Sequence, residues 1–180
     1  MALVLGTNSG FVSVAPTGDP GGTNTGFDNT SRAVKDTAPG GATKVTQVGW
    51  WCVNATEESN FEVGLYSHDV GEDAPLNRLY VDNTNAKGTD GGWKTVAVDW
   101  DITAGTIYWI GVQLDNTPTT TQSIYALAAG RQSFKNFQTA LTNPWGVSSE
   151  DTSIYPFYAV YTAGAGGVLV PHYYQKLLAG

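Results

Sequence analysis

The chain has 180 residues, a length that suits one domain with a tail or two small domains. Hydrophobic residues make up 41% of it and charged residues only 14%, so it can bury a core and is not a disordered chain. The net charge is −7 with nine scattered basic residues, which argues against a nucleic-acid partner, and no apolar stretch approaches the ~20 residues of a membrane span.

Cys52 is the single cysteine, which excludes an intramolecular disulfide and a Cys-rich zinc site. It lies in an apolar run, and this predicts a buried, structural thiol. The N-terminus has no basic stretch before its short apolar run, so we expect no signal peptide and synthesis in a cytoplasm.

The first 31 residues are predicted to form a loop-rich arm of Gly, Thr, Asn and Asp. Residues 3–5 and 11–14 are its candidate strands, and Asp19-Pro20-Gly21-Gly22 predicts a turn. A short run over residues 32–35 follows and ends before Pro39-Gly40-Gly41.

Residues 44–53 predict a central strand, because apolar side chains fall on both of its faces. One face carries Val48, Trp50 and Cys52, and the other carries Val45, Trp51 and Val53. Residues 61–66 alternate between apolar and other side chains, which predicts a half-buried strand.

Further strands are predicted along the rest of the chain, separated by turn signals such as Gly91-Gly92 and Ala104-Gly105. Turns that recur every ~8–12 residues are typical of an all-β sandwich or barrel. The predicted strands are residues 79–81, 93–102, 107–114, 123–127 and 155–161.

A Gly-rich linker over residues 163–167 is predicted to separate the sandwich, residues 1–162, from an apolar tail over residues 168–180. The tail either folds back on its own sandwich or docks on another subunit, because an apolar segment on a tether is a liability in water. Its best helical stretch is residues 172–179. The candidate subunit-interface residues are Val168, Leu169, Val170, Pro171, Tyr173, Tyr174, Leu177 and Leu178.

No catalytic residue is predicted, and we expect the chain not to be an enzyme. His68 precedes Asp69 in a predicted loop, where a solvated side chain is the ordinary interpretation. Asp99 and Asp101 share one strand face and are the pair that a glycan-active enzyme would use, which is the least favoured alternative.

Two predicted loops carry oxygen ligands that suit calcium, but solvated turn residues are the favoured interpretation, because Asp and Asn are common in turns. The first loop contains Asp69, Glu72 and Asp73, and the second contains Asp82, Asn83, Asn85 and Asp90. No other cofactor is expected.

Six tryptophans are many for this length, and an exposed indole can stack on a sugar ring. Trp145 follows Pro144 in a predicted loop and is the best candidate for exposure. Trp145 and Trp93 are therefore the candidate glycan contacts, although a loop tryptophan more often caps a sandwich than binds a sugar.

Three segments resemble jelly-roll accessory domains of tailed-phage structural proteins and of secreted bacterial proteins. They are Phe61-Glu62-Val63-Gly64-Leu65-Tyr66-Ser67, Gly92-Trp93-Lys94-Thr95-Val96 and Ile102-Thr103-Ala104-Gly105-Thr106-Ile107-Tyr108-Trp109-Ile110-Gly111-Val112. The resemblance implies a jelly-roll-like antiparallel β-sandwich, but it assigns no binding residue.

For function, the resemblance covers both virion components and carbohydrate-binding modules, and the expected absence of a signal sequence favours a virion structural protein, such as a capsid decoration, head fibre or tail component. Its partners would be other copies of itself or other virion proteins, and its location the virion. The alternative is an extracellular carbohydrate-binding or lectin-like domain with surface glycans as partners.

Overall fold

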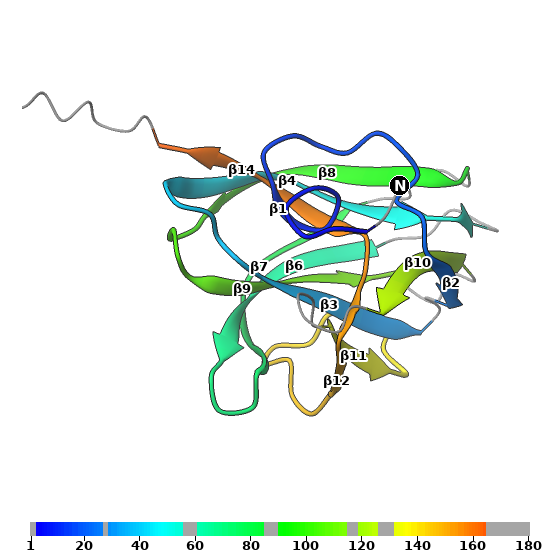
Figure 1. Ribbon diagram of the computed structural model, residues 1–180. Coiled ribbons are helices and arrows are strands. Elements are labelled where there is room, and N and C mark those ends of the chain that lie inside the picture. The colour runs from blue at the N-terminus through cyan, green and yellow to red at the C-terminus, as the bar shows by residue number, and fades with distance from the viewer. Residues whose placement is uncertain are drawn as a thin grey trace, which may run out of the picture.

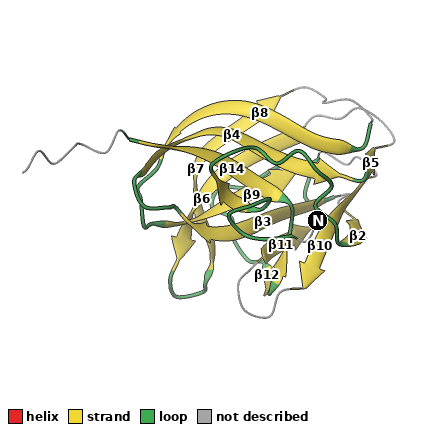
Figure 2. Ribbon diagram, turned by 45° about the horizontal axis from the view of Figure 1, so that its top comes forward, coloured by secondary structure: helices red, strands yellow, loops and turns green. Residues whose placement is uncertain are grey.

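The computed structural model describes residues 3–26, 29–55, 61–84, 90–114, 119–125 and 132–164. These residues form strands, turns and loops without a helix (Figure 2). Within them, accordingly, no helix has the length and apolar character needed to cross a membrane.

The strands of the described residues are numbered in chain order. They are β1 (Gly10–Val12), β2 (Thr23–Gly26), β3 (Thr30–Thr37), β4 (Ala42–Cys52), β5 (Asn54–Ala55), β6 (Phe61–Asp69), β7 (Ala74–Thr84), β8 (Gly92–Asp101), β9 (Ile107–Gln113), β10 (Thr119–Tyr125), β11 (Gln132–Asn136), β12 (Ser149–Asp151), β13 (Ser153–Ile154) and β14 (Phe157–Ala163).

Two sheets face each other and form the sandwich (Figure 1). The four-stranded sheet has the order β1-β14-β4-β8, and the six-stranded sheet has the order β12-β11-β3-β9-β6-β7. A smaller sheet, β13-β10-β2, lies at one end and also pairs with β5. The predicted fold class, an all-β antiparallel sandwich, is confirmed, and among the described pairs of named strands only β1 and β14 run parallel.

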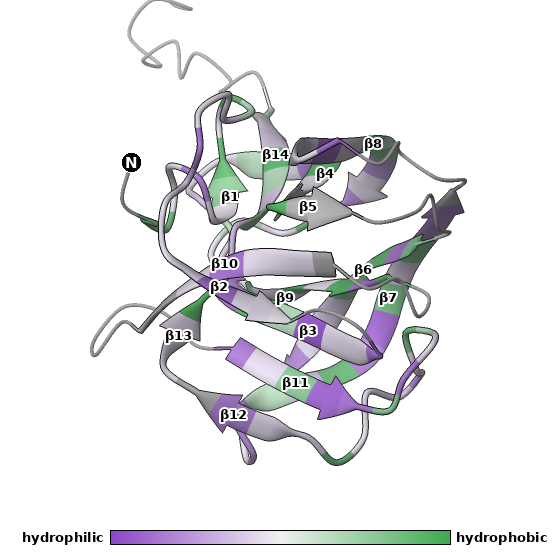
Figure 3. Ribbon diagram, turned by 90° about the vertical axis from the view of Figure 1, so that its right-hand side faces the viewer, coloured by the Kyte–Doolittle hydropathy of each residue, from purple (hydrophilic) through white to green (hydrophobic). Residues whose placement is uncertain are grey.

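The main core lies between the two large sheets. Trp50, Val48 and Cys52 of β4 point into it, as the sequence predicts, and meet Val63 and Ile110 from the opposite sheet. Burial of these side chains is the principal driving force for the fold, at roughly 25 cal/mol per Å² of apolar surface. Figure 3 shows hydrophobic stretches along strands such as β1, β6 and β14.

Residues 44–53 form a central strand as predicted, but Val45 does not face outward with Trp51. The pairing of β4 with β8 shifts between Val45 and Gln47, and such an irregularity breaks the alternation of side chains. Val45 therefore points into the main core, where it is fully buried.

The expectation that β6 is half-buried is wrong, because both of its faces are covered. Phe61, Val63 and Leu65 belong to the main core, and Tyr66 on the outer face belongs to a second cluster. That cluster contains Ala33, Tyr66, Trp109, Leu141 and Trp145. Its last two members lie on the cover segment, which we define as residues 137–148 between β11 and β12.

The cover segment is held on the outer face of the six-stranded sheet by hydrogen bonds. The Leu141 N–H donates to Glu62 at 2.5 Å, the Tyr66 hydroxyl donates to the Thr142 carbonyl at 2.9 Å, and the Trp145 N–H donates to the Leu76 carbonyl at 2.8 Å. Burial raises the pKa of the Tyr66 hydroxyl, which keeps it a donor. The segment thus adds a third layer to the sandwich.

The last strand, β14, extends beyond residue 162, where the predicted sandwich ends. β14 includes Ala163, and the Gly164 N–H donates to the Gly41 carbonyl at 3.0 Å. The first two residues of the predicted linker therefore belong to the sandwich. The predicted tail, residues 168–180, lies outside the described residues.

Candidate functional site

A hollow of about 370 Å³ opens between the turn that joins β6 to β7 and the end of the cover segment. We call this the hairpin hollow. Its lining is mostly apolar and includes three carboxylates. It is lined by Asp69, Glu72, Ala74, Pro75, Leu76, Pro144, Gly146, Val147, Ser148 and Glu150.

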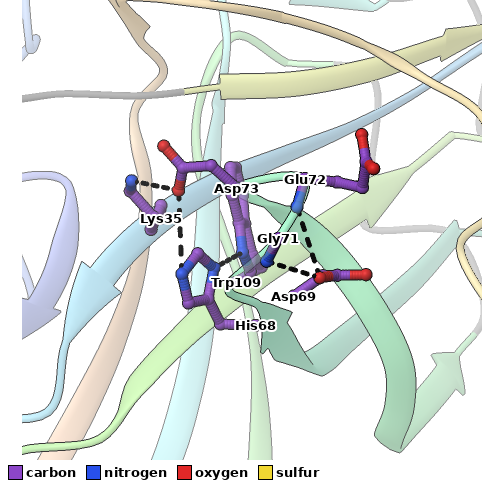
Figure 4. A network of polar contacts seen from close by, with 7 residues as sticks. All are labelled: Lys35, His68, Asp69, Gly71, Glu72, Asp73 and Trp109. Atoms are coloured by element: carbon purple, nitrogen blue, oxygen red, sulfur yellow. Dashed lines mark hydrogen bonds and ion pairs between the residues drawn. The ribbon is translucent and has the colours of Figure 1, made fainter.

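Asp69 shapes the turn on one side of the hairpin hollow. Its Oδ1 accepts the Gly71 N–H at 2.9 Å and the Glu72 N–H at 3.3 Å (Figure 4). An aspartate that bonds to the backbone two residues ahead favours a turn, which explains the sequence Asp69-Val70-Gly71 here. The turn leaves the Val70 side chain 85% exposed.

A polar network fixes the base of this turn (Figure 4). The Lys35 Nζ lies 2.6 Å from Asp73 Oδ1, and His68 Nε2 lies 3.7 Å from the same oxygen. The Trp109 indole N–H donates to His68 Nδ1 at 3.2 Å, so a neutral imidazole carries its proton on Nε2, toward Asp73. His68 thus lies on strand β6, contacts Trp109 of β9 and Asp73 of the turn, and is not the solvated loop residue that the sequence predicts.

Trp145 anchors the opposite wall of the hairpin hollow. Its indole N–H donates to Ser133 Oγ at 2.9 Å, and its ring meets that of Tyr66 edge-on with centroids 4.9 Å apart. Lys135 Nζ donates to the Trp145 carbonyl at 2.5 Å, and burial lowers the pKa of this ammonium. Glu150 Oε1 accepts from Ser148 Oγ at 2.5 Å and from the buried Ser133 Oγ at 3.2 Å.

The surface around the hairpin hollow is both apolar and acidic. Val147 is 96% exposed and Leu76 is 38% exposed, and Val70 lies on the adjacent turn. Asp69, Glu72 and Glu150 supply negative charge, and the lining contains neither lysine nor arginine. This arrangement suits contact with an apolar group that carries a positive charge.

The expectation that Trp145 is exposed is wrong, because its side chain has no exposed surface. Trp145 does lie in a loop between two strands, as its neighbours Pro144 and Gly146 predict. The cover segment, however, turns the indole inward, where it contacts Tyr66 and Ser133. Of the alternatives weighed from the sequence, the capping tryptophan matches this position. A sugar ring cannot reach the indole without displacing the cover segment.

Trp93 is half-buried on the outer face of the four-stranded sheet. Its ring meets Trp51 and Tyr158 edge-on, with centroids 5.4 and 5.2 Å away, and its N–H donates to the Gly18 carbonyl at 2.8 Å. The N-terminal arm thus crosses this face. Part of the Trp93 indole remains exposed to a ligand.

The two carboxylates considered for glycan cleavage share one lysine. Lys44 Nζ lies 2.6 Å from Asp99 and 3.3 Å from Asp101, on an exposed sheet face. The hydrogen bond to Asp99, with that to Asp101, raises the pKa of the Lys44 ammonium. These carboxylates form a surface ion-pair network away from the hairpin hollow.

The two loops considered for calcium are arranged differently from the prediction. Asp69 caps a turn and Asp73 pairs with Lys35, while Asp82 and Asn83 belong to strand β7 rather than to a loop. Asn85 lies outside the described residues. In the part of the chain that the structure describes, no group of three His, Cys, Asp or Glu side chains converges on a metal position.

Of the predicted contact residues that the structure describes, Trp145 is buried behind the wall of the hairpin hollow, and Trp93 lies on the other sheet and not in the lining of the hollow. The tail candidates, Val168 to Leu178, lie outside the described residues, and Cys52 is buried in the main core as predicted. Sequence reasoning missed Val70 and Val147. Both are apolar residues in or beside predicted loops, and from that position their exposure could have been predicted.

Comparison with known proteins does not place the chain in a family. No family model matches the sequence, and no curated protein matches it. Among solved structures, the C-terminal domain of the BC2L-C lectin from Burkholderia cenocepacia aligns with a TM-score of 0.22 and 9% identity, over 72% of this chain and 93% of that domain.

Proposed function

We propose that this chain is a non-catalytic structural protein of a virus particle, a capsid decoration, head fibre or tail component that assembles with copies of itself or with other virion proteins. The observation that carries the proposal is the apolar, acidic surface around the hairpin hollow. Val147 and Val70 expose 96% and 85% of their side chains on two adjoining loops. Exposed apolar surface next to a concave site is typical of protein interaction surfaces.

Two further observations support a binding rather than a catalytic role. The histidine and the carboxylate pair that the sequence offers for catalysis are engaged in structural contacts, His68 with Trp109 and Asp99 with Lys44. The virion class itself is supported by the resemblance of residues 61–67, 92–96 and 102–112 to tailed-phage accessory domains.

Light scattering after size-exclusion chromatography of the full chain, with negative-stain microscopy, tests the proposal. We expect a defined multimer, ring or filament whose mass is a multiple of the chain mass. A monomer at every concentration, without particles in the micrographs, would contradict self-assembly.

A carbohydrate-binding domain is the second candidate, and the position of Trp93 favours it. Its half-buried indole lies beside Trp51 on an outer sheet face, where a sugar ring can stack on it. Titration with polysaccharides, followed by tryptophan fluorescence, would then show quenching that Trp93→Ala abolishes. The matched control is Phe137→Ala, which removes an aromatic side chain that is 92% exposed elsewhere.

A further inference from the structure

The charges around the hairpin hollow indicate which kind of chain segment it can bind. Three carboxylates and mostly apolar groups line it, and the Lys135 Nζ, 3.7 Å from a Cβ built on Gly146, donates to the Trp145 carbonyl. Lys35 is paired with Asp73. The hollow therefore complements a segment that combines apolar side chains with positive charge and carries no acid.

This same sequence contains such a segment in residues 165–180. It includes the apolar run Val168-Leu169-Val170-Pro171, it carries Lys176 and His172, and it contains neither Asp nor Glu. In a chain with 16 acidic and nine basic residues, this composition complements the hollow rather than repelling it.

The position of Gly164 favours a hollow on a neighbouring copy over the hollow of the same copy. The chain leaves the four-stranded sheet at Gly164, next to Gly41, whereas the hollow lies on the outer face of the other sheet. Return to its own hollow requires the chain to pass around the sandwich. An extended segment of this length spans ~50 Å, which is enough to reach an adjoining copy.

We propose that the hairpin hollow is the docking site for residues 165–180 of a neighbouring copy of this chain. The inference rests on the proposed function, since it names the partner and the surface used in assembly. Val70, Leu76 and Val147 would cover the apolar side chains of the segment, and Glu72 and Glu150 would face its positive charge.

The test uses the full chain and measures its association by light scattering and analytical ultracentrifugation. Two variants alter the hollow at exposed positions, Glu72→Lys and Val147→Asp. Their matched controls are Asp90→Lys and Val14→Asp, which make the corresponding charge reversal and apolar-to-acid change at exposed positions outside the hollow. Urea unfolding checks that all four variants are folded.

We expect the hollow variants to weaken association about tenfold or more and the controls to match the wild type. A synthetic peptide of residues 165–180, added in excess, should dissociate the wild-type multimer. A multimer that the peptide and both hollow variants leave unchanged would overturn the docking site while leaving the assembly function intact. A monomeric full chain would overturn both.

Discussion

Gly49 shows how one residue can determine the packing of an entire sheet face. It lies opposite Tyr158 in the pairing of β4 with β14, and a Cβ built on it would lie 2.3 Å from the Tyr158 ring. The ring therefore occupies the space that a side chain at position 49 would need. Burial there raises the pKa of Tyr158 to about 12.

Gly49→Ala is expected to destabilise the protein by about 1–3 kcal/mol, because it forces the Tyr158 ring away from β4. The displaced ring also disturbs Trp93, so the near-ultraviolet circular dichroism should change. Gly40→Ala is the control, since a Cβ at that position meets nothing within 4 Å. Urea unfolding measures both, and equal stabilities would contradict the steric explanation.

Asp36 links the N-terminal strand to the six-stranded sheet. Its Oδ2 accepts the Phe11 N–H at 2.8 Å and its Oδ1 accepts the Thr37 N–H at 2.7 Å. Burial outweighs these two bonds and raises the pKa of the Asp36 carboxyl above 3.8. The folded protein consequently holds this proton more tightly than the unfolded chain does.

The raised pKa of the Asp36 carboxyl determines in which direction the free energy of unfolding changes with pH. The stability contributed by the protonated carboxyl is fully present below pH 3.8 and is lost as the pH rises through the folded-state pKa. The free energy of unfolding of the wild type minus that of Asp36→Ala should therefore fall as the pH increases over this interval. Urea unfolding across the pH series measures it, and a difference that grows with pH would refute the assignment.

At the scale of elements, hydrophobic periodicity predicts the positions of β4 and β8 well, because the pattern of apolar side chains lies within each strand itself. It fails for Val45, since a register shift depends on the partner strand and leaves no mark in the sequence of β4. It fails for Tyr66 because the residues that cover it, Leu141 and Trp145, follow some 75 positions later. A long-range cover cannot be read from a local pattern.

The cover segment itself gives a prediction. Trp145→Ala removes a fully buried indole and its bond to Ser133, which should cost about 3–5 kcal/mol of unfolding free energy. Val147→Ala, two residues further along and 96% exposed, should change it by no more than about 0.5 kcal/mol. Urea unfolding followed by circular dichroism compares the two, and a Trp145→Ala variant as stable as the control would show that the segment is not part of the core.

At the scale of the whole molecule, folding and assembly depend on different forces. The described body is held by apolar burial between its sheets, and its Lys44 ion pairs are exposed, so they contribute little to stability. The proposed contact between copies, in contrast, places positive charge against the carboxylates of the hairpin hollow. The two processes should consequently respond differently to salt, even though both bury apolar surface.

Raising the salt concentration from roughly 0.05 to 0.5 M shortens the distance over which exposed charges interact to a few ångströms. The dissociation constant of the multimer should increase, because the attraction between Glu72 or Glu150 and the basic segment is screened. The urea midpoint of unfolding should stay constant or rise slightly, since screening also relieves the self-repulsion of a chain with net charge −7. Sedimentation and urea titrations on the same samples separate these effects. Association that strengthens with salt would mean that apolar contact alone joins the copies, and parallel losses of association and stability would mean that the multimer dissociates because its subunits unfold.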